Sequence, residues 1–243
     1  MTALYEPKGA AREYAALAFN MYKGCEHGCI YCYAPNATFK KRDVFYGNVQ
    51  PRKDIIEILK KDIRRLIKKK VKKEPVLLSF TCDPYQSTEK DLMLTKQAIQ
   101  ILNENGFPVR ILTKAGKLAQ RDLKLLSQFS NNEFGTSLTL SRKKDSLEWE
   151  PFAATPQERI DNLVAAKNEG LFTWISLEPI IDPEQALDII EMTWNFVDFY
   201  GVGKLNYHKH QKTIDWIETR ERIRNRLTSY KKNFMFHESL ENC

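Results

Sequence analysis

Residues 22–35 read Tyr22-Lys23-Gly24-Cys25-Glu26-His27-Gly28-Cys29-Ile30-Tyr31-Cys32-Tyr33-Ala34-Pro35, and they hold three of the five cysteines of the chain. Zinc is usually closed by four protein ligands, and simple iron–sulfur carriers also use four thiolates. This loop offers three, with glycines that let it wrap tightly around a ligand. The spacing therefore predicts a metal site, and we favour an iron–sulfur site with one position left for another ligand.

Other interpretations of the loop stay open. His27 or a distant residue could complete a structural zinc knuckle, and Cys25 and Cys29 have the spacing of neighbours on a helix. A disulfide is disfavoured because the N-terminal residues show no signal-peptide pattern and no apolar run approaches the ~18 residues of a membrane span. We therefore expect a cytoplasmic protein with no membrane partner.

The rest of the 243-residue chain alternates apolar strand-like runs with amphipathic runs, which is typical of parallel β/α units. Strands are expected at about residues 15–22, 75–81, 109–113, 134–140, 172–177 and 196–202. Six such units can form an incomplete β/α barrel or an open doubly wound sheet. In both, the chemistry belongs at the carboxyl ends of the strands.

The helical signals are strongest in three places. A long amphipathic helix is expected over residues 52–70, and capping boxes begin at Thr88 and Thr155. Gly106 and Gly170 fit the ends of the two capped helices. Residues 212–243 are expected to form a helix and a less regular end that covers the open edge of the sheet.

Positive charge is concentrated in one segment. Residues 60–73 contain nine Lys or Arg and one acid, Asp62, so the net charge of this segment is +8. The whole chain has a net charge of +7, and the remaining residues together therefore carry −1. A solvated helix face is at least as good an explanation as a phosphate-binding patch. Residues 40–42 follow the cysteine loop and residues 142–144 follow the fourth strand, both on the expected active-site side. They could contact a phosphate backbone, with Phe39, Tyr46 or Trp149 available for stacking.

Polar residues recur where the expected strands end. These positions are Thr81, Cys82 and Asp83 after the second strand, Lys114 after the third, Ser137 in the fourth and Glu178 after the fifth. Because parallel strands end at the same edge of a sheet, we expect these side chains to line one pocket.

Several motifs together carry a family resemblance. Cys-x3-Cys-x-Tyr-Cys-Tyr at 25–33, Thr-x-Asp-Pro-Tyr-Gln at 81–86, Trp-Glu-Pro at 149–151, Leu-Glu-Pro at 177–179 and Gly-x-Gly-Lys-x-Asn-Tyr at 201–207 resemble the spore photoproduct lyase-like branch of the radical S-adenosylmethionine superfamily. The resemblance implies a partial (β/α)6 TIM-like barrel with the cluster loop after the first strand. It implies a single domain over residues 1–243, with a barrel core at 15–207 and a C-terminal helix and tail at 208–243.

The resemblance also implies the cofactors and their ligands. Cys25, Cys29 and Cys32 would bind a 4Fe–4S cluster, which would reductively cleave S-adenosylmethionine to a 5′-deoxyadenosyl radical. Tyr31 would lie against the adenine, Lys114 and Ser137 would bind polar groups of the cofactor, and Tyr33 would lie beside the path of the radical. We also expect Thr81, Asp83 and Glu178 to bind the cofactor.

One position departs from the resemblance. The photoproduct lyases return a hydrogen atom from a cysteine that aligns with Phe80, whereas Cys82 occupies a cofactor-contacting position. Cys82 could be a displaced donor or a buried thiol. True photoproduct repair is therefore doubtful.

We expect a radical enzyme that acts on nucleic acid or a nucleotide, with DNA or RNA and a reductase or flavodoxin-type electron donor as partners. A zinc-containing nucleic-acid-binding protein without catalytic activity, or a radical enzyme for a small molecule or peptide, are the alternatives. The oligomeric state is left open.

Overall fold

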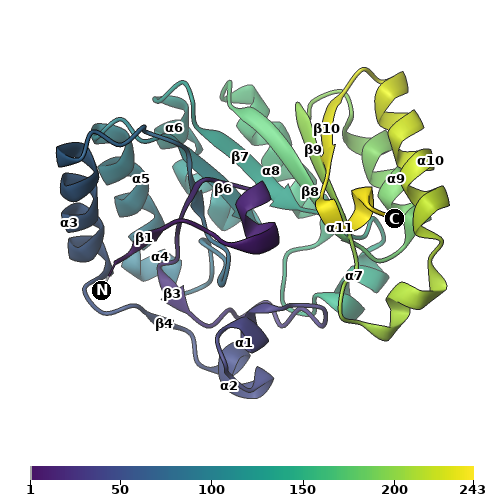
Figure 1. The fold of residues 1–243 in the computed structure, drawn as a ribbon, viewed down its shortest axis with the longest axis horizontal. Coiled ribbons are helices and arrows are strands. Elements are labelled where there is room, and N and C mark those ends of the chain that lie inside the picture. The colour runs from purple at the N-terminus through teal and green to yellow at the C-terminus, as the bar shows by residue number, and fades with distance from the viewer. Residues whose placement is uncertain (1) are drawn as a thin grey trace.

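The computed structural model describes residues 2–243, which form a mostly parallel sheet with helices between its strands (Figure 1). The eight-stranded sheet has the order β1-β2-β5-β6-β7-β8-β9-β10. Only β1 runs antiparallel to its neighbour, and every other pair is parallel. The strands are β1 (Leu4–Tyr5), β2 (Leu17–Phe19), β5 (Val76–Leu78), β6 (Val109–Thr113), β7 (Glu133–Ser137), β8 (Phe172–Ile180), β9 (Phe199–Lys204) and β10 (Asn233–Phe236).

The strand order distinguishes the two predicted architectures. Along the parallel part of the sheet, the strands stand in the order of the sequence, whereas a doubly wound sheet reverses its order in the middle. The edge strands β1 and β10 do not pair with each other, so the sheet stays open. The predicted α/β class with an incomplete barrel is confirmed.

Helices connect the strands. They are α1 (Ala34–Ala37), α2 (Arg42–Gly47), α3 (Ile55–Lys68), α4 (Glu89–Leu92), α5 (Leu94–Glu104), α6 (Leu123–Ser127), α7 (Lys143–Trp149), α8 (Pro156–Asn168), α9 (Pro183–Thr193), α10 (Trp216–Ser229) and α11 (Glu238–Glu241). Short 3-10 helices are η1 (Gly9–Glu13), η2 (Lys117–Asp122) and η3 (Lys209–Thr213). No helix of residues 2–243 is long and apolar enough to cross a membrane.

The two ends of the sequence correct the prediction. The first strand was expected over residues 15–22, but β2 covers only Leu17–Phe19, and Tyr22–Lys23 forms β3, which pairs with β4 (Gln50–Pro51) in a separate two-stranded sheet. Residues 233–236, expected in a less regular tail, form β10 and extend the parallel sheet beyond β9. This strand was missed because four residues are too few to establish an alternating pattern.

One predicted capping box is present and the other is not. Thr155 and Glu158 cap α8 reciprocally, and Pro156 is the first residue of that helix. Thr88 makes no side-chain cap, because its own backbone is helical, with φ of −57° and ψ of −23°, whereas an N-cap residue is typically extended. Glu89 turns inward and accepts hydrogen bonds from the backbone N–H groups of Leu94, at 3.1 Å, and Thr95, at 2.9 Å. Glu89 is fully buried and therefore caps the following helix, α5.

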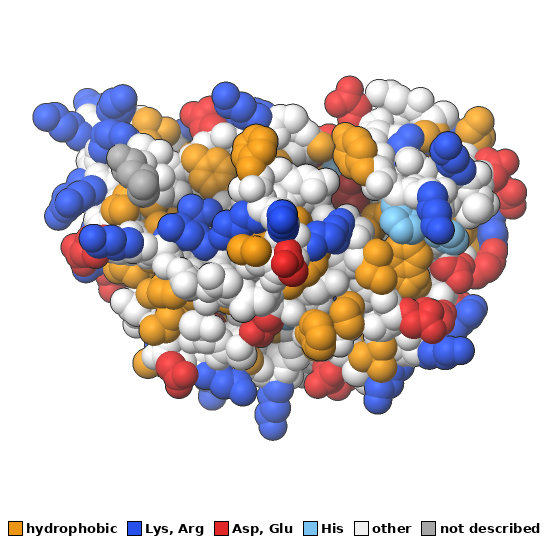
Figure 2. Space-filling view, turned by 90° about the horizontal axis from the view of Figure 1, so that it is seen from below, with side chains coloured by type: hydrophobic (Ala, Val, Ile, Leu, Met, Phe, Trp, Pro, Cys, Tyr) orange, Lys and Arg blue, Asp and Glu red, His pale blue; other side chains and the backbone are white. Residues whose placement is uncertain are grey.

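The basic segment lies mainly on α3. Figure 2 shows Lys and Arg side chains gathered at the left end of the molecule, where Figure 1 places α3. The acid among them, Asp62, is buried and accepts hydrogen bonds from the backbone of Ala3, at 2.5 Å, and Leu4, at 3.1 Å. The inner face of α3 thus holds β1, while most of its cations face solvent.

Candidate active site

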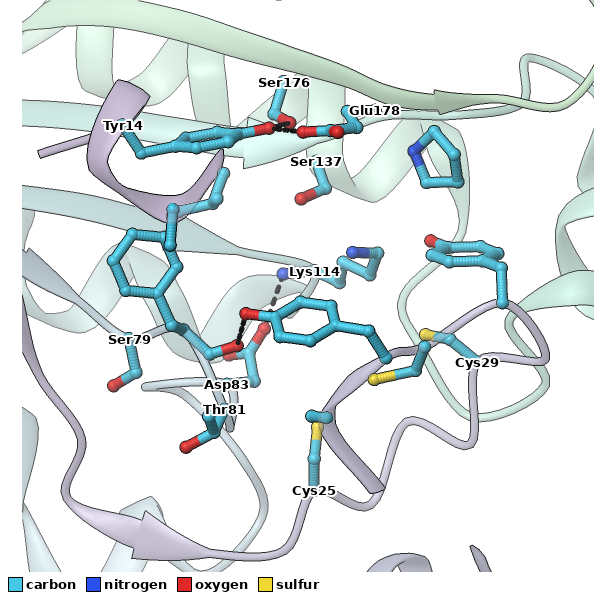
Figure 3. A pocket seen from close by; sticks show the side chains of 18 of the residues that line it. Tyr14, Cys25, Cys29, Ser79, Thr81, Asp83, Lys114, Ser137, Ser176 and Glu178 are labelled. Carbon is cyan, nitrogen blue, oxygen red and sulfur yellow. Dashed lines mark hydrogen bonds between the residues drawn. The ribbon is translucent and has the colours of Figure 1, made fainter. Parts of the chain in front are cut away.

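A cavity of about 450 Å³ opens at the carboxyl ends of the parallel strands (Figure 3). Its volume lies within the range of roughly 300–1,000 Å³ that is common for small-molecule sites. Every site residue predicted from the sequence lines this cavity: Cys25, Cys29, Tyr31, Cys32, Tyr33, Thr81, Cys82, Asp83, Lys114, Ser137 and Glu178. The shared edge of the sheet thus brings together residues that are more than 150 positions apart.

The backbone of the cysteine loop turns tightly at its first glycine. Gly24 has φ of +86°, and a Cβ there would lie 2.5 Å from the carbonyl oxygen of Phe45. The next residue, Cys25, donates its N–H to the same carbonyl at 3.2 Å. Only glycine fits this close approach, which fixes the start of the loop against α2.

Helix α2 also holds the end of the loop. The guanidinium of Arg42 donates to the carbonyl oxygens of Cys29, at 3.4 Å, and Cys32, at 3.2 Å. The hydroxyl of Tyr46 donates to the carbonyl oxygen of Cys29 at 2.8 Å. Arg42 and Tyr46, considered from the sequence as contacts for a nucleic acid, therefore have a structural role in holding the loop.

The three thiols of the loop fit a cationic cluster. Burial is the main cause that raises the pKa of Cys25, Cys29 and Cys32, and the negative charge of neighbouring thiolates raises the pKa of Cys25 and Cys29 further. Thiols in such surroundings ionise only when a cation compensates them, as metal binding does.

A single zinc ion and an iron–sulfur cluster require different arrangements of the thiolates. Zinc binds sulfur at about 2.3 Å in a tetrahedron, so the thiolates of a zinc knuckle converge on one point. Within residues 2–243, no group of three or more His, Cys, Asp and Glu side chains is arranged to hold a metal ion. Thiolates that bind different irons of one cluster do not need to converge on one point.

Asp83 joins the cysteine loop to the ends of two strands. One carboxylate oxygen accepts from the N–H of Tyr85, at 2.8 Å, and the hydroxyl of Thr113, at 2.7 Å, and the other accepts from the N–H of Lys114, at 2.7 Å. His27 Nε2 lies 3.1 Å from that second oxygen. Burial raises the pKa of Asp83, but His27 and the two N–H donors outweigh burial and lower it to about 2. Asp83 is thus a fixed anion with four partners in the protein.

A buried ion pair fixes Tyr31 in the cavity wall. Its hydroxyl donates to Glu150, and Glu150 lies 2.6 Å from the guanidinium of Arg159. Arg159 also donates to the carbonyl oxygen of Ser137 at 3.0 Å, and the ammonium of Lys114 lies 5.6 Å from the centre of the Tyr31 ring. From the sequence, Glu150 was recognised only as part of the Trp-Glu-Pro motif. Its pairing with Arg159 was not predicted, because no local pattern links a loop carboxylate to a helix arginine nine residues later.

The opposite end of the cavity contains a second polar group of residues. Tyr14 donates to Glu178 and lies 3.1 Å from the hydroxyl of Ser176 (Figure 3). The ring of Tyr14 stacks on His237 with centroids 4.4 Å apart, and His237 Nε2 is 3.6 Å from Glu178. A Cβ at Gly203, in β9, would lie 2.6 Å from the carboxyl carbon of Glu178. The glycine therefore leaves the space that the Glu178 side chain occupies. Sequence reasoning missed Tyr14 and His237.

Three further predicted residues lie where β5 ends. Tyr33 donates to the carbonyl oxygen of Phe80 at 3.1 Å, which places its hydroxyl beside the position without the expected cysteine. The Thr81 hydroxyl oxygen is buried and has no hydrogen-bond partner among the described residues. Cys82 is 8% exposed, and burial is the main cause that raises its pKa. An unpaired buried hydroxyl at the cavity wall fits a site that binds a polar ligand.

The fold and the site define an α/β-barrel enzyme whose cavity is built around a three-cysteine loop. The sequence profile of the radical SAM superfamily matches residues 19–197, and the chain belongs to this superfamily. It is therefore a radical S-adenosylmethionine enzyme, and the cofactors of its family are a 4Fe–4S cluster and S-adenosylmethionine. This membership removes the support for a zinc protein without catalytic activity.

Known proteins are similar to this chain over most of its length. An uncharacterized protein of Methanocaldococcus jannaschii is 30% identical over 224 residues, which are 90% of this chain and 83% of that protein. A spore photoproduct lyase complexed with dinucleoside spore photoproduct has a TM-score of 0.71 at 12% identity, over 96% of this chain and 79% of that one. SuiB of Streptococcus suis, bound to S-adenosylmethionine, has a TM-score of 0.68 at 13% identity, over 90% of this chain and 49% of SuiB. At these identities the two structural matches show the shared fold.

Proposed function

We propose that Cys25, Cys29 and Cys32 hold a 4Fe–4S cluster and that S-adenosylmethionine binds beside it in the cavity. The observation that carries this proposal is that the three-cysteine loop and the polar strand ends line the same cavity. When bound, the cluster supplies one electron that cleaves S-adenosylmethionine, and the resulting 5′-deoxyadenosyl radical takes a hydrogen atom from the substrate.

The residues of the chain orient the cofactor and shield it. The Lys114 ammonium provides the charge that a cofactor carboxylate needs, and the hydroxyls of Thr81 and Ser137 provide hydrogen bonds to its polar groups. Tyr31 presents an aromatic face for the adenine and is held in place by its hydrogen bond to Glu150. The apolar part of the cavity wall, which includes Phe80, Leu112 and Leu205, would limit the access of water to the reactive species.

Three other predicted residues, Tyr33, Cys82 and Glu178, also line the cavity, and each has its own surroundings. Tyr33 is exposed on one side and hydrogen bonded to Phe80, so it lies where substrate approaches. Cys82 lines the cavity and is the thiol nearest in sequence to the missing hydrogen donor. Glu178, in β8, lines the cavity and accepts a hydrogen bond from Tyr14, and we assign it to cofactor or substrate hydroxyls.

Iron content tests the proposed ligands. Protein reconstituted anaerobically with iron and sulfide should bind about four irons, and Cys32→Ser should bind markedly fewer, because clusters of this type require their thiolates. Cys243→Ser is the matched control, since Cys243 lies outside the loop and does not line the cavity. Equal iron content in the two variants, or stable zinc in place of iron, would refute the proposal.

For the substrate we propose a nucleic acid or nucleotide. The support is Tyr207, which lines the cavity, is 97% exposed and is available for stacking on a base. The structurally similar lyase binds a dinucleoside photoproduct. Phe80 in place of the hydrogen-donor cysteine argues against photoproduct repair itself. SuiB, with the same fold, has been captured with a precursor peptide, so a peptide is the alternative.

Substrate stimulation separates these possibilities. The reduced holoenzyme is incubated with S-adenosylmethionine and with ultraviolet-damaged DNA, undamaged DNA, RNA or peptide. We expect a nucleic acid to stimulate formation of 5′-deoxyadenosine and to bind more weakly at high salt. Stimulation by peptide alone would overturn the nucleic-acid assignment.

We also place the protein in the cytoplasm with a reductase or flavodoxin-type donor, because its five free cysteines suit a reducing compartment.

A further inference from the structure

The polar residues at the end of the cavity away from the cysteine loop come from segments far apart in the sequence. Tyr14 directly follows η1, Ser176 and Glu178 belong to β8, and His237 directly follows β10. Figure 3 shows Tyr14, Ser176 and Glu178 across the cavity from the cysteines. We call Glu13, Tyr14, Ser176, Glu178 and His237 the Glu178 cluster.

His237 holds Tyr14 and Glu178 in place without lining the cavity itself. It is 2% exposed, and its ring stacks on Tyr14 with the two planes 20° apart. His237 Nδ1 lies 2.9 Å from Glu13, which fixes the orientation of the ring. Nε2 forms no hydrogen bond among the described residues and lies 3.6 Å from a carboxylate oxygen of Glu178. His237 is thus placed to orient Glu178 rather than to bind a ligand itself.

Two glycines of β9 leave the space for this cluster. A Cβ at Gly201 would lie 3.3 Å from His237 Nε2, and a Cβ at Gly203 would lie 2.6 Å from the carboxyl carbon of Glu178. Residues two apart in a strand share one face, so both glycines face the cluster. The Gly-x-Gly part of the motif at 201–207 therefore has a physical role, which is to make room for His237 and Glu178.

Most of the Glu178 cluster lies outside the part of the chain that the superfamily profile matches. That part is residues 19–197, whereas Glu13 and Tyr14 precede it and His237 follows it. One fold supports many reactions through the residues placed around its site. The residues outside the matched part are therefore the ones that we expect to adapt the cavity to the substrate of this chain.

The Glu178 cluster selects for groups that donate hydrogen bonds. An ionised carboxylate only accepts, and its two oxygens have about four acceptor positions. Tyr14 occupies one of them at Glu178, and burial is the main cause that raises the pKa of Tyr14, so its hydroxyl keeps its proton. Asp83, the other carboxylate that lines the cavity, already has four partners. Glu178 thus has the acceptor positions that are left for a ligand.

We propose that the Glu178 cluster binds the edge of a nucleobase, whose N–H groups donate to Glu178, and that His237 is a positioning residue for this contact. This inference rests on the proposed function, which places the cofactor beside the cysteines and a nucleic acid or nucleotide in the rest of the cavity. The amino and ring N–H groups of bases are donors, whereas a phosphodiester has none. A base therefore fits this end of the cavity, and a phosphate does not.

Binding is measured on unreduced, reconstituted protein saturated with S-adenosylmethionine, so that the cofactor part of the cavity is filled and no turnover occurs. The probes are a short single-stranded oligonucleotide and an abasic one with the same number of phosphates. Wild type should bind the base-containing probe about tenfold or more tightly, because stacking and hydrogen bonds to a charged acceptor add affinity. Glu178→Gln should lower this ratio of dissociation constants about threefold or more, because the acceptor loses its charge.

The role of His237 is tested by non-additivity. His237→Phe keeps a ring against Tyr14 but cannot bind Glu13 or attract Glu178, so it should also lower the ratio. Because His237 acts through Glu178, His237→Phe should change the ratio little further in the Glu178→Gln protein. Independent effects of the two substitutions would show that His237 only supports the fold.

Matched controls carry the same substitutions away from the cavity. His208→Phe and Glu184→Gln should keep the wild-type ratio, since neither residue lines the cavity. The inference is overturned if wild type binds the abasic probe as tightly as the base-containing one, or if the controls lower the ratio as much as Glu178→Gln does. It is also overturned if a neutral peptide binds more tightly than the oligonucleotide and loses affinity in Glu178→Gln. Absence of dithionite-driven 5′-deoxyadenosine in the wild type would refute the proposed function instead, while the binding ratio would still decide what the cluster binds.

Discussion

Arg159→Leu is expected to destabilise the protein strongly, although the residue lies outside the predicted ligand set. The side chains of Arg159 and Glu150 are 1% and 0% exposed, and they approach to 2.6 Å. Arg159 also donates to the carbonyl oxygens of Ser137, at 3.0 Å, and Ala154, at 2.8 Å. Removing one member of a buried pair leaves the other charge without a partner and costs about 3–5 kcal/mol. At roughly 2–4 °C per kcal/mol for a chain of this size, the melting temperature should fall by about 6–20 °C.

The matched control is a similar pair on the surface. Arg222 binds Glu184 at 2.5 Å, but the two side chains are 38% and 62% exposed. Arg222→Leu should therefore change the free energy of unfolding by less than about 1 kcal/mol. Both variants are compared by urea unfolding of the apo-protein, followed by circular dichroism.

A double-mutant cycle isolates the pair. The double variant Glu150→Gln/Arg159→Leu should be more stable than the sum of the single losses predicts, with a coupling free energy of about 0.5–3 kcal/mol. Glu150→Gln alone should also weaken binding of S-adenosylmethionine, because Tyr31 loses its charged acceptor. Additive effects, or an Arg159→Leu loss no larger than that of Arg222→Leu, would refute a stabilising role for the buried pair.

Three further predictions concern local features. Thr155→Ala should lower the free energy of unfolding by about 1 kcal/mol, because the cap of α8 is lost. Thr88→Ala is the control, since Thr88 makes no cap, and equal losses in the two variants would contradict this prediction. Gly135→Ala should lower the free energy of unfolding by about 1–3 kcal/mol, because its Cβ would lie 2.3 Å from the buried indole ring of Trp174. Gly47→Ala is the control, because a Cβ there meets nothing within 4 Å. Thermal melts that show equal losses in the two variants would contradict this prediction. Burial raises the pKa of Glu150, but the adjacent guanidinium outweighs it and lowers that pKa, so its stabilising effect is full above about pH 4.3 and is lost as the pH falls through the folded-state pKa. Acid titration of stability should be steeper in the wild type than in Glu150→Gln, and identical slopes would contradict this.

The part of the site that could be predicted from the sequence follows from parallel strands. Asp83, Lys114 and Ser137 lie directly after or at the ends of apolar runs, and parallel strands bring such ends to one edge. A strand pattern and a loop motif are local properties, so they can be recognised without the rest of the fold. The strand pattern alone could not separate an incomplete barrel from a doubly wound sheet; the family resemblance favoured the incomplete barrel, and the strand order of the structure agrees with it.

The part that could not be predicted depends on distant contacts. His237 Nδ1 lies 2.9 Å from Glu13, a residue 224 positions away, and no periodicity reports such a pair. The same holds for Tyr14, which directly follows η1 and donates to Glu178. The capping box expected at Thr88 failed for a different reason, because the backbone of Thr88 is itself helical and the sequence pattern does not report that angle.

The most direct test of the central claim is the reductive cleavage of S-adenosylmethionine by the anaerobically reconstituted protein. We predict that dithionite-reduced wild type forms 5′-deoxyadenosine, measured by liquid chromatography, and that Cys25→Ser, Cys29→Ser and Cys32→Ser each form none. Cys243→Ser should retain the wild-type rate. A wild-type protein that holds its full iron content, is reduced and still forms no 5′-deoxyadenosine would contradict the account.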